Sequence, residues 1–181
     1  WYVTNIDYYH YLQAARRLVY SAQGDRAMVE ILRDMGAEIR WEGETLVSRA
    51  SKLHGLRVDC AQVPDLVPIL AVAMAAAEGE SRITGAARLR IKESDRLSAM
   101  AAALTAAGAD VSELPDGLII RGGKRLHAAK IEGCNDHRIV MAMTMASEIA
   151  DGELTITDAE ATAKSAPAFW REFEHLGGLA R

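Results

Sequence analysis

An internal repeat restricts the fold of this chain more than any other feature. The stretch AEGESRITGA (77–86) matches ADGELTITDA (150–159) at an offset of 73 residues. Each match follows an almost wholly apolar stretch, LVPILAVAMAAA in one copy and IVMAMTMASEIA in the other. GDRAMVEILRDMGAEI (24–39) also resembles SDRLSAMAAALTAAGADV (94–111). A repeat of this length indicates one supersecondary unit that is used several times around a shared core.

Each unit is predicted to alternate helices with strands. An amphipathic helix is expected from Ala27 to Met35, ending at Gly36. A hairpin is expected in AEIRWEGETLVSRA (37–50), turning near Glu42 and Gly43, and a second one in ADVSELPDGLIIRGG (109–123), turning at 115–117. Short strands, GLRVDC (55–60) and SRITGA (81–86), flank the first apolar stretch.

The apolar stretches decide between the possible fold classes. They lack a polar stripe, so the helices that they form should be buried on all sides. Buried helices with sheets outside indicate a closed, pseudo-symmetric α/β (α+β) domain rather than a doubly wound fold with outer helices. A solenoid is the alternative, but about two and a half copies are few for one.

Composition excludes several function classes. A net charge of −4 argues against wholesale binding of nucleic acid, which needs a basic face. Two cysteines, Cys60 and Cys134, indicate a reduced compartment and favour structural thiols over the weaker alternative of a catalytic nucleophile. The histidines are not spaced as zinc ligands, so no metal site is predicted. The apolar run 66–77 is too short to span a bilayer and no signal peptide is visible, so a cytoplasmic location is expected, with neither nucleic acid nor membrane as partner.

Residues 1–22 form an atypical, tyrosine-rich segment. All five tyrosines of the chain fall within its first twenty residues, and the chain begins with Trp1 rather than methionine. The pattern YYHYLQAARRLVY is compatible with a helix that carries one aromatic face. Such a helix packs on the rest of the chain or, as the alternative, offers a surface for a partner or for self-association.

Charged and polar residues gather directly before the predicted helices. Capping explains the acids and the serine, because these side chains accept hydrogen bonds from the free amides of a first turn. Capping does not explain the cations, because the helix dipole disfavours positive charge at an N-terminus. The candidate caps are Asp65, Asp95, Asp136 and Ser165, and the cations are Lys92, Arg96, Arg138 and Lys164.

The cations converge on one place if the repeated units face one another. A place of this kind, lined by helix N-termini, suits a strongly anionic small ligand such as a phosphate or a carboxylate. Asp65, Glu93 and His137 lie in the same segments and can move protons, which predicts group-transfer chemistry. GKRLHA (123–128) lacks the pattern of a phosphate loop, and its preceding glycines indicate the exit of a hairpin.

Three segments resemble signature segments of one enzyme family, the 3-phosphoshikimate 1-carboxyvinyltransferases or EPSP synthases. They are IKESDRL (91–97), NDHRI (135–139) and ATAKSAPAFW (161–170). QGDRAMVEILRDMGAEI (23–39) and VPDLVPILA (63–71) fit the same family in the same order. The UDP-N-acetylglucosamine enolpyruvyl transferases share the fold but differ in these signatures, so they are the lesser alternative.

The resemblance implies a fold and a reaction. The family has two similar domains, each made of three βαβαββ units with helices inside and sheets outside. Residues 23–181 correspond to the C-terminal domain and hold two complete repeats and part of a third. The family's transferases move the enolpyruvyl group of phosphoenolpyruvate to the 5-hydroxyl of shikimate 3-phosphate, in the shikimate pathway toward chorismate and the aromatic amino acids. Neither a cofactor nor a metal is implied.

The resemblance also implies roles in proton transfer and in binding shikimate 3-phosphate. Asp65 matches the carboxylate that binds the sugar-acid hydroxyls and takes the 5-hydroxyl proton. Lys92 matches the lysine that contacts this hydroxyl and relays protons. Glu93 matches the acid proposed to protonate the methylene carbon of phosphoenolpyruvate, and His137 matches a neighbour that tunes Glu93.

Phosphoenolpyruvate itself is implied to bind the cations. Arg96 and Arg138 match the pair that holds its carboxylate, a task suited to the guanidinium fork. Lys164 matches the lysine at the departing phosphate. Asp95 and Asp136 are left as caps or as anchors of the site.

Two functions of different class follow. In the first, the chain is a catalytic half that turns over only when it is joined to the family's other domain, which supplies further groups for both substrates. In the second, it is a stand-alone domain that binds anions or associates with itself through residues 1–22 and catalyses nothing.

Overall fold

The computed structural model describes residues 27–43 and 45–181, and its elements fall into three consecutive groups. The first is α2 (Ala27–Asp34), β1 (Glu38–Glu42) and β2 (Thr45–Arg49). The second is β3 (Arg57–Asp59), α3 (Val67–Ala76), β4 (Gly79–Thr84), α4 (Arg96–Ala106), β5 (Asp110–Leu114) and β6 (Gly117–Gly122). The third is β7 (Leu126–Ile131), α5 (His137–Ala146), β8 (Ala150–Ile156) and α6 (Phe169–His175). Short 3-10 helices connect them: η2 (Pro64–Leu66), η3 (Ala87–Ile91), η4 (Ser147–Ile149) and η5 (Ala159–Lys164).

The described strands form three separate sheets. β1 pairs with β2, the order β3-β4-β6-β5 makes a four-stranded sheet, and β7 pairs with β8. Both predicted hairpins are confirmed, because Glu42 pairs with Thr45 across one turn and Leu114 with Gly117 across the other. The β3-β4 and β7-β8 pairs are both parallel, and each is connected through a helix.

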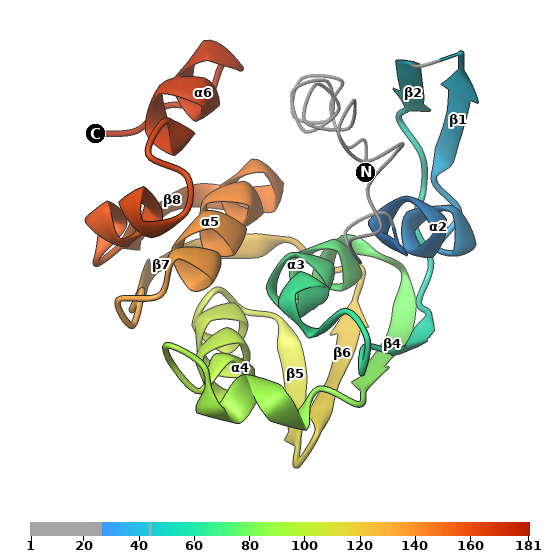
Figure 1. Cartoon of the computed structure of the whole chain (residues 1–181), viewed down its shortest axis with the longest axis horizontal. Helices are drawn as coiled ribbons and strands as arrows, with labels where there is room; N and C mark the ends of the chain where they lie inside the picture. The colour runs from blue at the N-terminus through green and yellow to red at the C-terminus, as the bar shows by residue number, and fades with distance from the viewer. Residues whose placement is uncertain (1–26, 44) are drawn as a thin grey trace.

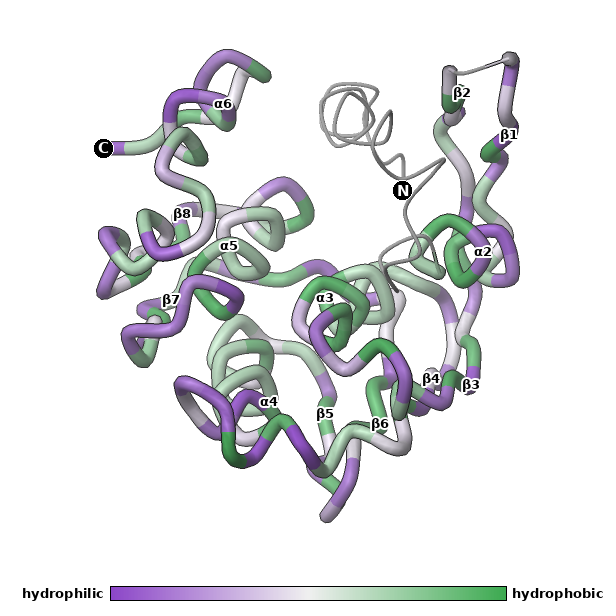
Figure 2. The backbone as a smooth tube through the Cα atoms, in the orientation of Figure 1, coloured by the Kyte–Doolittle hydropathy of each residue, from purple (hydrophilic) through white to green (hydrophobic). Residues whose placement is uncertain are grey.

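The apolar helices lie inside and the sheets lie outside, as the sequence predicts (Figure 1). In α3 the buried residues include Leu70, Ala71 and Val72 in succession, and no residue of this helix is classed as exposed, although Ile69, Ala73 and Ala76 are only partly buried. α3, α4 and α5 pack against one another, and α3 also packs against β6. Figure 2 shows the hydrophobic colour along α3 and β6, whereas hydrophilic residues gather on the segment that leads into α4.

Three further predictions concern the tyrosine-rich segment, membrane-spanning helices and the first amphipathic helix. The tyrosine-rich segment 1–22, with both of its interpretations and its boundary, lies outside the described residues. In the described part of the chain, no helix combines the length and the apolar character that crossing a membrane requires. The predicted helix that starts at Ala27 is confirmed as α2, and it ends before Gly36, whose φ of +96° suits a residue without a side chain.

Candidate functional site

Four segments that are far apart in the sequence bring the predicted site residues together. η2 precedes α3, residues 92–95 lead into α4, a tight turn leads into α5, and η5 ends beside that turn. Because α3, α4 and α5 pack side by side, the residues at their N-termini become neighbours. One network of hydrogen bonds and ion pairs, which passes through Asp136, joins the seven predicted site residues. They are Asp65, Lys92, Glu93, Arg96, His137, Arg138 and Lys164.

A buried ion pair between Arg96 and Asp136 forms the centre of this network. Nε of Arg96 lies 2.7 Å from Oδ2 of Asp136, and Nη2 lies 3.2 Å from Oδ1. The arginine side chain is 3 % exposed and the aspartate side chain is fully buried. This two-point geometry fixes the plane of the guanidinium, so the pair ties the first turn of α4 to the first turn of α5.

Each carboxylate oxygen of Asp136 also accepts a hydrogen bond from a second donor. Its Oδ1 accepts the backbone N–H of Arg138 at 2.9 Å, which caps α5, and its Oδ2 accepts the Ser94 hydroxyl at 2.9 Å. Burial alone would raise the pKa of Asp136, but the hydrogen bonds from Arg96, from the Arg138 amide and from Ser94 outweigh burial and hold this pKa below its usual range. The carboxylate is therefore charged at neutral pH.

Asp65 faces the cations from the other side. Its Oδ1 lies 3.0 Å from Nη1 of Arg96 and 3.5 Å from Nζ of Lys92, and its Oδ2 lies 3.6 Å from Nη2 of Arg138. Arg138 also donates to the main-chain oxygen of Asp65 at 3.0 Å. The side chain of Asp65 caps neither η2 nor α3, so the capping interpretation is wrong for this residue.

Glu93, His137 and Lys164 form a second group of contacts in the network. Oε2 of Glu93 lies 3.0 Å from Nδ1 of His137 and 3.9 Å from Nζ of Lys164. Lys164 also donates to the main-chain oxygen of Asn135 at 2.5 Å. His137 is nearly buried, whereas Glu93 is 39 % exposed, so the carboxyl can exchange protons with a ligand while the imidazole holds it in place.

A metal could in principle approach three ligand atoms here. Glu93, Asp136 and His137 offer atoms that all lie within 4.8 Å of one another. However, both oxygens of Asp136 already accept hydrogen bonds from the Arg96 guanidinium, whose charge repels a cation. The donor set therefore does not fit a resident metal.

Of the two remaining candidate caps, Asp95 caps its helix and Ser165 does not. Asp95 caps α4, since its Oδ1 accepts the backbone N–H of Ser98 at 3.1 Å, and its Oδ2 pairs with Arg90 at 2.9 Å. This confirms the prediction that Asp95 is structural. Ser165 does not cap α6, because this helix starts only at Phe169 and has no side-chain cap.

The cap gives a first prediction. We expect Asp95→Ala to lower the free energy of unfolding by about 1–2 kcal/mol, because the Ser98 amide in the first turn of α4 loses its acceptor. Urea unfolding monitored by circular dichroism measures this change. The control is Asp151→Ala, which removes only a pair in which both side chains are more than half exposed and should cost less than about 0.5 kcal/mol. Equal losses in the two variants would contradict the capping role.

A second prediction concerns how the stability of the fold changes at low pH. The pKa of Asp95 is lowered: burial alone would raise it, but the Ser98 amide and Arg90 together outweigh burial. A carboxylate whose folded pKa is depressed stabilises the fold above its unfolded pKa, about 4, and this contribution is lost as pH falls through the folded pKa. We therefore expect the stability to fall below about pH 4. Asp95→Asn retains a capping oxygen but cannot titrate, so its stability should fall less steeply; identical slopes would refute the linkage.

Two residues of the network were not predicted from the sequence. Ser94 binds Asp136, and Asn135 offers its main-chain oxygen to Lys164. Asn135 has φ of +48° and follows Cys134 at +54°, so the turn before α5 is left-handed at two successive non-glycine residues. The signal for this turn was the asparagine itself, which tolerates this conformation better than most residues.

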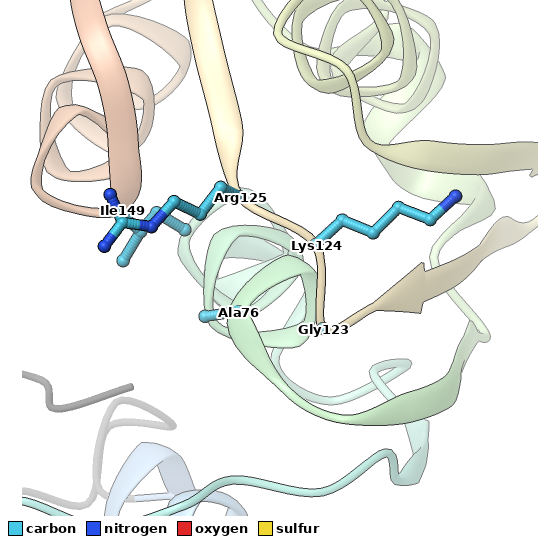
Figure 3. A pocket seen from close by; sticks show the side chains of 5 residues that line it. All are labelled: Ala76, Gly123, Lys124, Arg125 and Ile149. Carbon is cyan, nitrogen blue, oxygen red and sulfur yellow. The ribbon is translucent and has the colours of Figure 1, made fainter.

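The cysteines and the Gly-Gly segment lie outside this chemistry. Burial, and then the neighbouring charge of Asp59, raise the pKa of Cys60 to about 11. Partial burial, followed by nearby acids, raises the pKa of Cys134 as well. Neither thiol is therefore an activated nucleophile. Gly123 directly follows β6, as expected for a hairpin exit, and in Figure 3 the side chains of Lys124 and Arg125 beside it point in opposite directions, so they do not converge on an anion.

With this geometry in place, the chain can be compared with known proteins. The family model for EPSP synthase (3-phosphoshikimate 1-carboxyvinyltransferase) matches residues 18–173. The 3-phosphoshikimate 1-carboxyvinyltransferase of Clostridium novyi is 46 % identical over 159 residues, which are 88 % of this chain and 37 % of that protein. The protein of the same name from Halobacterium salinarum is 48 % identical over 162 residues, with the same coverage of the two chains.

Solved structures agree with these matches. EPSP synthase from Acinetobacter baumannii superposes with a TM-score of 0.70 at 35 % identity, over 83 % of this chain and 38 % of that one. The enolpyruvyl transferase NikO from Streptomyces tendae superposes with a TM-score of 0.72 over 86 % of this chain and 36 % of NikO, at 20 % identity, which is a likeness of fold alone. The chain spans somewhat over a third of the length of the curated relatives that it matches.

Proposed function

Because this chain belongs to the EPSP synthase family, we propose that it is the C-terminal half of a 3-phosphoshikimate 1-carboxyvinyltransferase. In this proposal the complete enzyme is a transferase that adds the 5-hydroxyl of shikimate 3-phosphate to phosphoenolpyruvate and then eliminates phosphate. The observation that carries the proposal is the convergence of four cations and three proton-transfer groups, from four distant segments, on one network.

The cations suit the carboxylate and the phosphate of phosphoenolpyruvate. Arg138 is 33 % exposed, so its guanidinium can reach a ligand. The contacts of Arg96 with Asp136 and Asp65 use three of the five N–H groups of a guanidinium, and its side chain is 3 % exposed, so Arg138 offers the accessible N–H groups and Arg96 contributes at most its remaining two. In the proposal these two arginines hold the carboxylate, and Lys164 stands at the departing phosphate.

The acids and the histidine suit the two proton transfers. Asp65 would accept the proton of the attacking 5-hydroxyl, with Lys92 at 3.5 Å to stabilise the charge that develops. Glu93 would protonate the methylene carbon of phosphoenolpyruvate. Its hydrogen bond with His137 places the carboxyl and provides a second group that can hold a proton.

The site is open on one side in this chain. Lys92, Glu93, Asp65 and Lys164 have exposed fractions between 36 % and 42 %. Proton transfer to carbon in an open site competes with water, so turnover requires a cover. We therefore propose that the rest of the enzyme, including its N-terminal domain, closes the site and binds the remainder of both substrates, and that this chain alone does not turn over.

A chimera tests this function. The chain replaces the matching segment of the Clostridium novyi relative, and phosphate release from phosphoenolpyruvate plus shikimate 3-phosphate is measured for the chimera and for the chain alone. Release by the chimera only is the expected result. Absence of release from a folded chimera, with phosphoenolpyruvate binding retained by the chain alone, would favour the stand-alone binding domain.

A further inference from the structure

The left-handed backbone conformations outside glycine gather in one place of the described chain. Within residues 27–43 and 45–181, positive φ occurs outside glycine at Cys134 (+54°), Asn135 (+48°) and Asp158 (+55°). The first two belong to the turn before α5, and the third joins β8 to η5. This conformation costs free energy in residues that carry a side chain, and such residues cluster where function needs a fixed geometry.

The side chain of Asp158 fastens this turn to the end of β8. Its Oδ2 accepts the backbone N–H of Asn135 at 2.9 Å and the hydroxyl of Thr157 at 3.4 Å. The hydroxyl oxygen of Thr157 accepts the backbone N–H of Gly133 at 3.1 Å. The turn is therefore bonded to the end of β8 on both sides of Cys134.

The main chain of Asp158 begins η5 at the same time. Its oxygen accepts the N–H of Ala161 at 2.9 Å, and η5 then runs to Lys164. The ammonium of Lys164 donates to the main-chain oxygen of Asn135 at 2.5 Å. Asn135 is thus bonded to Asp158 through its amide and to Lys164 through its oxygen, so the position of the Lys164 ammonium depends on the Asp158 carboxylate.

The preceding repeat shows what this position holds when the aspartate is absent. The residue 73 positions before Asp158 is Gly85, whose φ is +73°. There a carboxylate from β3 holds the turn: Oδ1 of Asp59 accepts the backbone N–H of Ala61 at 2.9 Å, and a side chain at position 85 would collide with this oxygen. Glycine adopts the left-handed conformation without the cost that an aspartate meets, so the aspartate at 158 is explained by its side chain.

The lysines of the two units also have different partners. Lys92 lies 72 positions before Lys164 and directly follows η3, as Lys164 ends η5. Nζ of Lys92 lies 3.5 Å from Oδ1 of Asp65, whereas Lys164 donates to the turn before the apolar helix. The left-handed aspartate thus occurs in the unit whose lysine is bonded to the turn.

We propose that Asp158 is a positioning residue: it holds the turn at Asn135 so that the main-chain oxygen of this residue fixes the ammonium of Lys164. This inference rests on the proposed function, in which Lys164 stands at the departing phosphate. An ammonium has three N–H groups, so the bond to Asn135 leaves two for the phosphate. Asp158 acts through Asn135, and its loss misplaces a charge that stabilises the leaving group, which lowers kcat more than it weakens binding.

Phosphate release by the chimera with the Clostridium novyi relative tests this role. Asp158→Gly should fold, since Gly85 has the same backbone conformation, and should lower kcat about 10–100-fold with little change in KM for shikimate 3-phosphate. Asp158→Asn keeps an acceptor oxygen and tolerates the left-handed conformation, so it should restore most of kcat. The matched control, Glu160→Gln, removes an exposed carboxylate on the same segment and should leave kcat unchanged. An unchanged kcat in Asp158→Gly would overturn the proposal, as would an equal loss in Asp158→Asn or in Glu160→Gln.

A double-mutant cycle distinguishes positioning from a general loss of stability. If Asp158 acts through the lysine, adding Asp158→Gly to Lys164→Met should lower kcat little further. A loss of stability alone would instead multiply with the loss caused by Lys164→Met, and this result would refute the positioning role.

Competitive acetylation of lysines tests the same contacts in the chain without turnover. An amine bonded to a main-chain oxygen is shielded, so labelling of Lys164 by trace acetic anhydride should rise about threefold or more in Asp158→Gly. It should stay unchanged in Asp158→Asn, with the exposed Lys52 as the internal reference. Unchanged labelling in Asp158→Gly would contradict the inference. If this labelling rose while the chimera released no phosphate, the proposed function would fail and the control of Lys164 by Asp158 would stand.

Discussion

Replacement of Asp136 by alanine is expected to lower the free energy of unfolding by about 3–5 kcal/mol. The loss has one main cause: Arg96 is 3 % exposed and would remain buried without its two-point partner. The cap of α5 and the acceptor for Ser94 are lost at the same time. Urea unfolding monitored by far-ultraviolet circular dichroism, at neutral pH and with the slope compared between variants, measures the change.

The double variant Asp136→Leu with Arg96→Met separates charge from packing. Replacing both partners removes the buried charges together, so this protein should be more stable than Asp136→Ala alone, although it still leaves the Arg138 amide without an acceptor. Asp95→Ala, a more exposed cap on the neighbouring helix, provides the scale for an ordinary loss. A change below about 1.5 kcal/mol for Asp136→Ala would show that Arg96 finds other partners, and would contradict its description as a fixed ion pair.

Glu93→Gln is expected to lower the rate of phosphate release by the chimera about 10²–10⁴-fold. The amide has nearly the shape of the carboxyl but cannot deliver a proton, and its hydrogen bond with His137 no longer involves an acid. The rate constant at saturating substrates is the quantity to measure. Binding of phosphoenolpyruvate should change little, because the proposed carboxylate site consists of Arg96 and Arg138.

The stability of this variant distinguishes a chemical role from a structural one. Glu93 is 39 % exposed, and exposed pairs contribute little, so the free energy of unfolding should change by less than about 0.5 kcal/mol. Glu132→Gln is the matched control, since it removes an exposed carboxylate a few residues before α5, the helix that carries His137, and should leave the rate unchanged. An unchanged rate in Glu93→Gln would remove Glu93 from the mechanism. A comparable loss in Glu132→Gln would attribute the effect to overall charge.

Much of the site could be predicted because its parts are local. The cations before α4 and α5 stand where helix dipoles disfavour them, and this conflict was visible without a structure. Asp95 was correctly interpreted as a cap because capping depends on residues only three positions away. The hairpin turns were predicted for the same reason, since a turn such as Pro115-Asp116-Gly117 is determined by its own residues.

The different roles of Asp65 and Asp136 could not be predicted from the sequence. Both precede an apolar helix and were equal candidates for caps. In the fold, Asp136 caps α5 and is also buried against Arg96, whereas Asp65 caps nothing and meets three cations. The difference arises from burial. The side chain of Asp136 is fully buried, where a carboxylate must be fully paired, whereas the side chain of Asp65 is 40 % exposed.

By itself the sequence determined the alternation of helices and strands, the burial of the apolar helices and the residues that carry charge to their N-termini. These properties follow from periodicity and from turn residues, which act over a few positions of the chain. Only the tertiary structure decided which charged residues contact one another. The acidic partners of Arg96 lie 31 and 40 residues away in the sequence, and Arg138 bonds to Asp65, which lies 73 residues before it. Such contacts are set by how three helices pack, which no local pattern encodes.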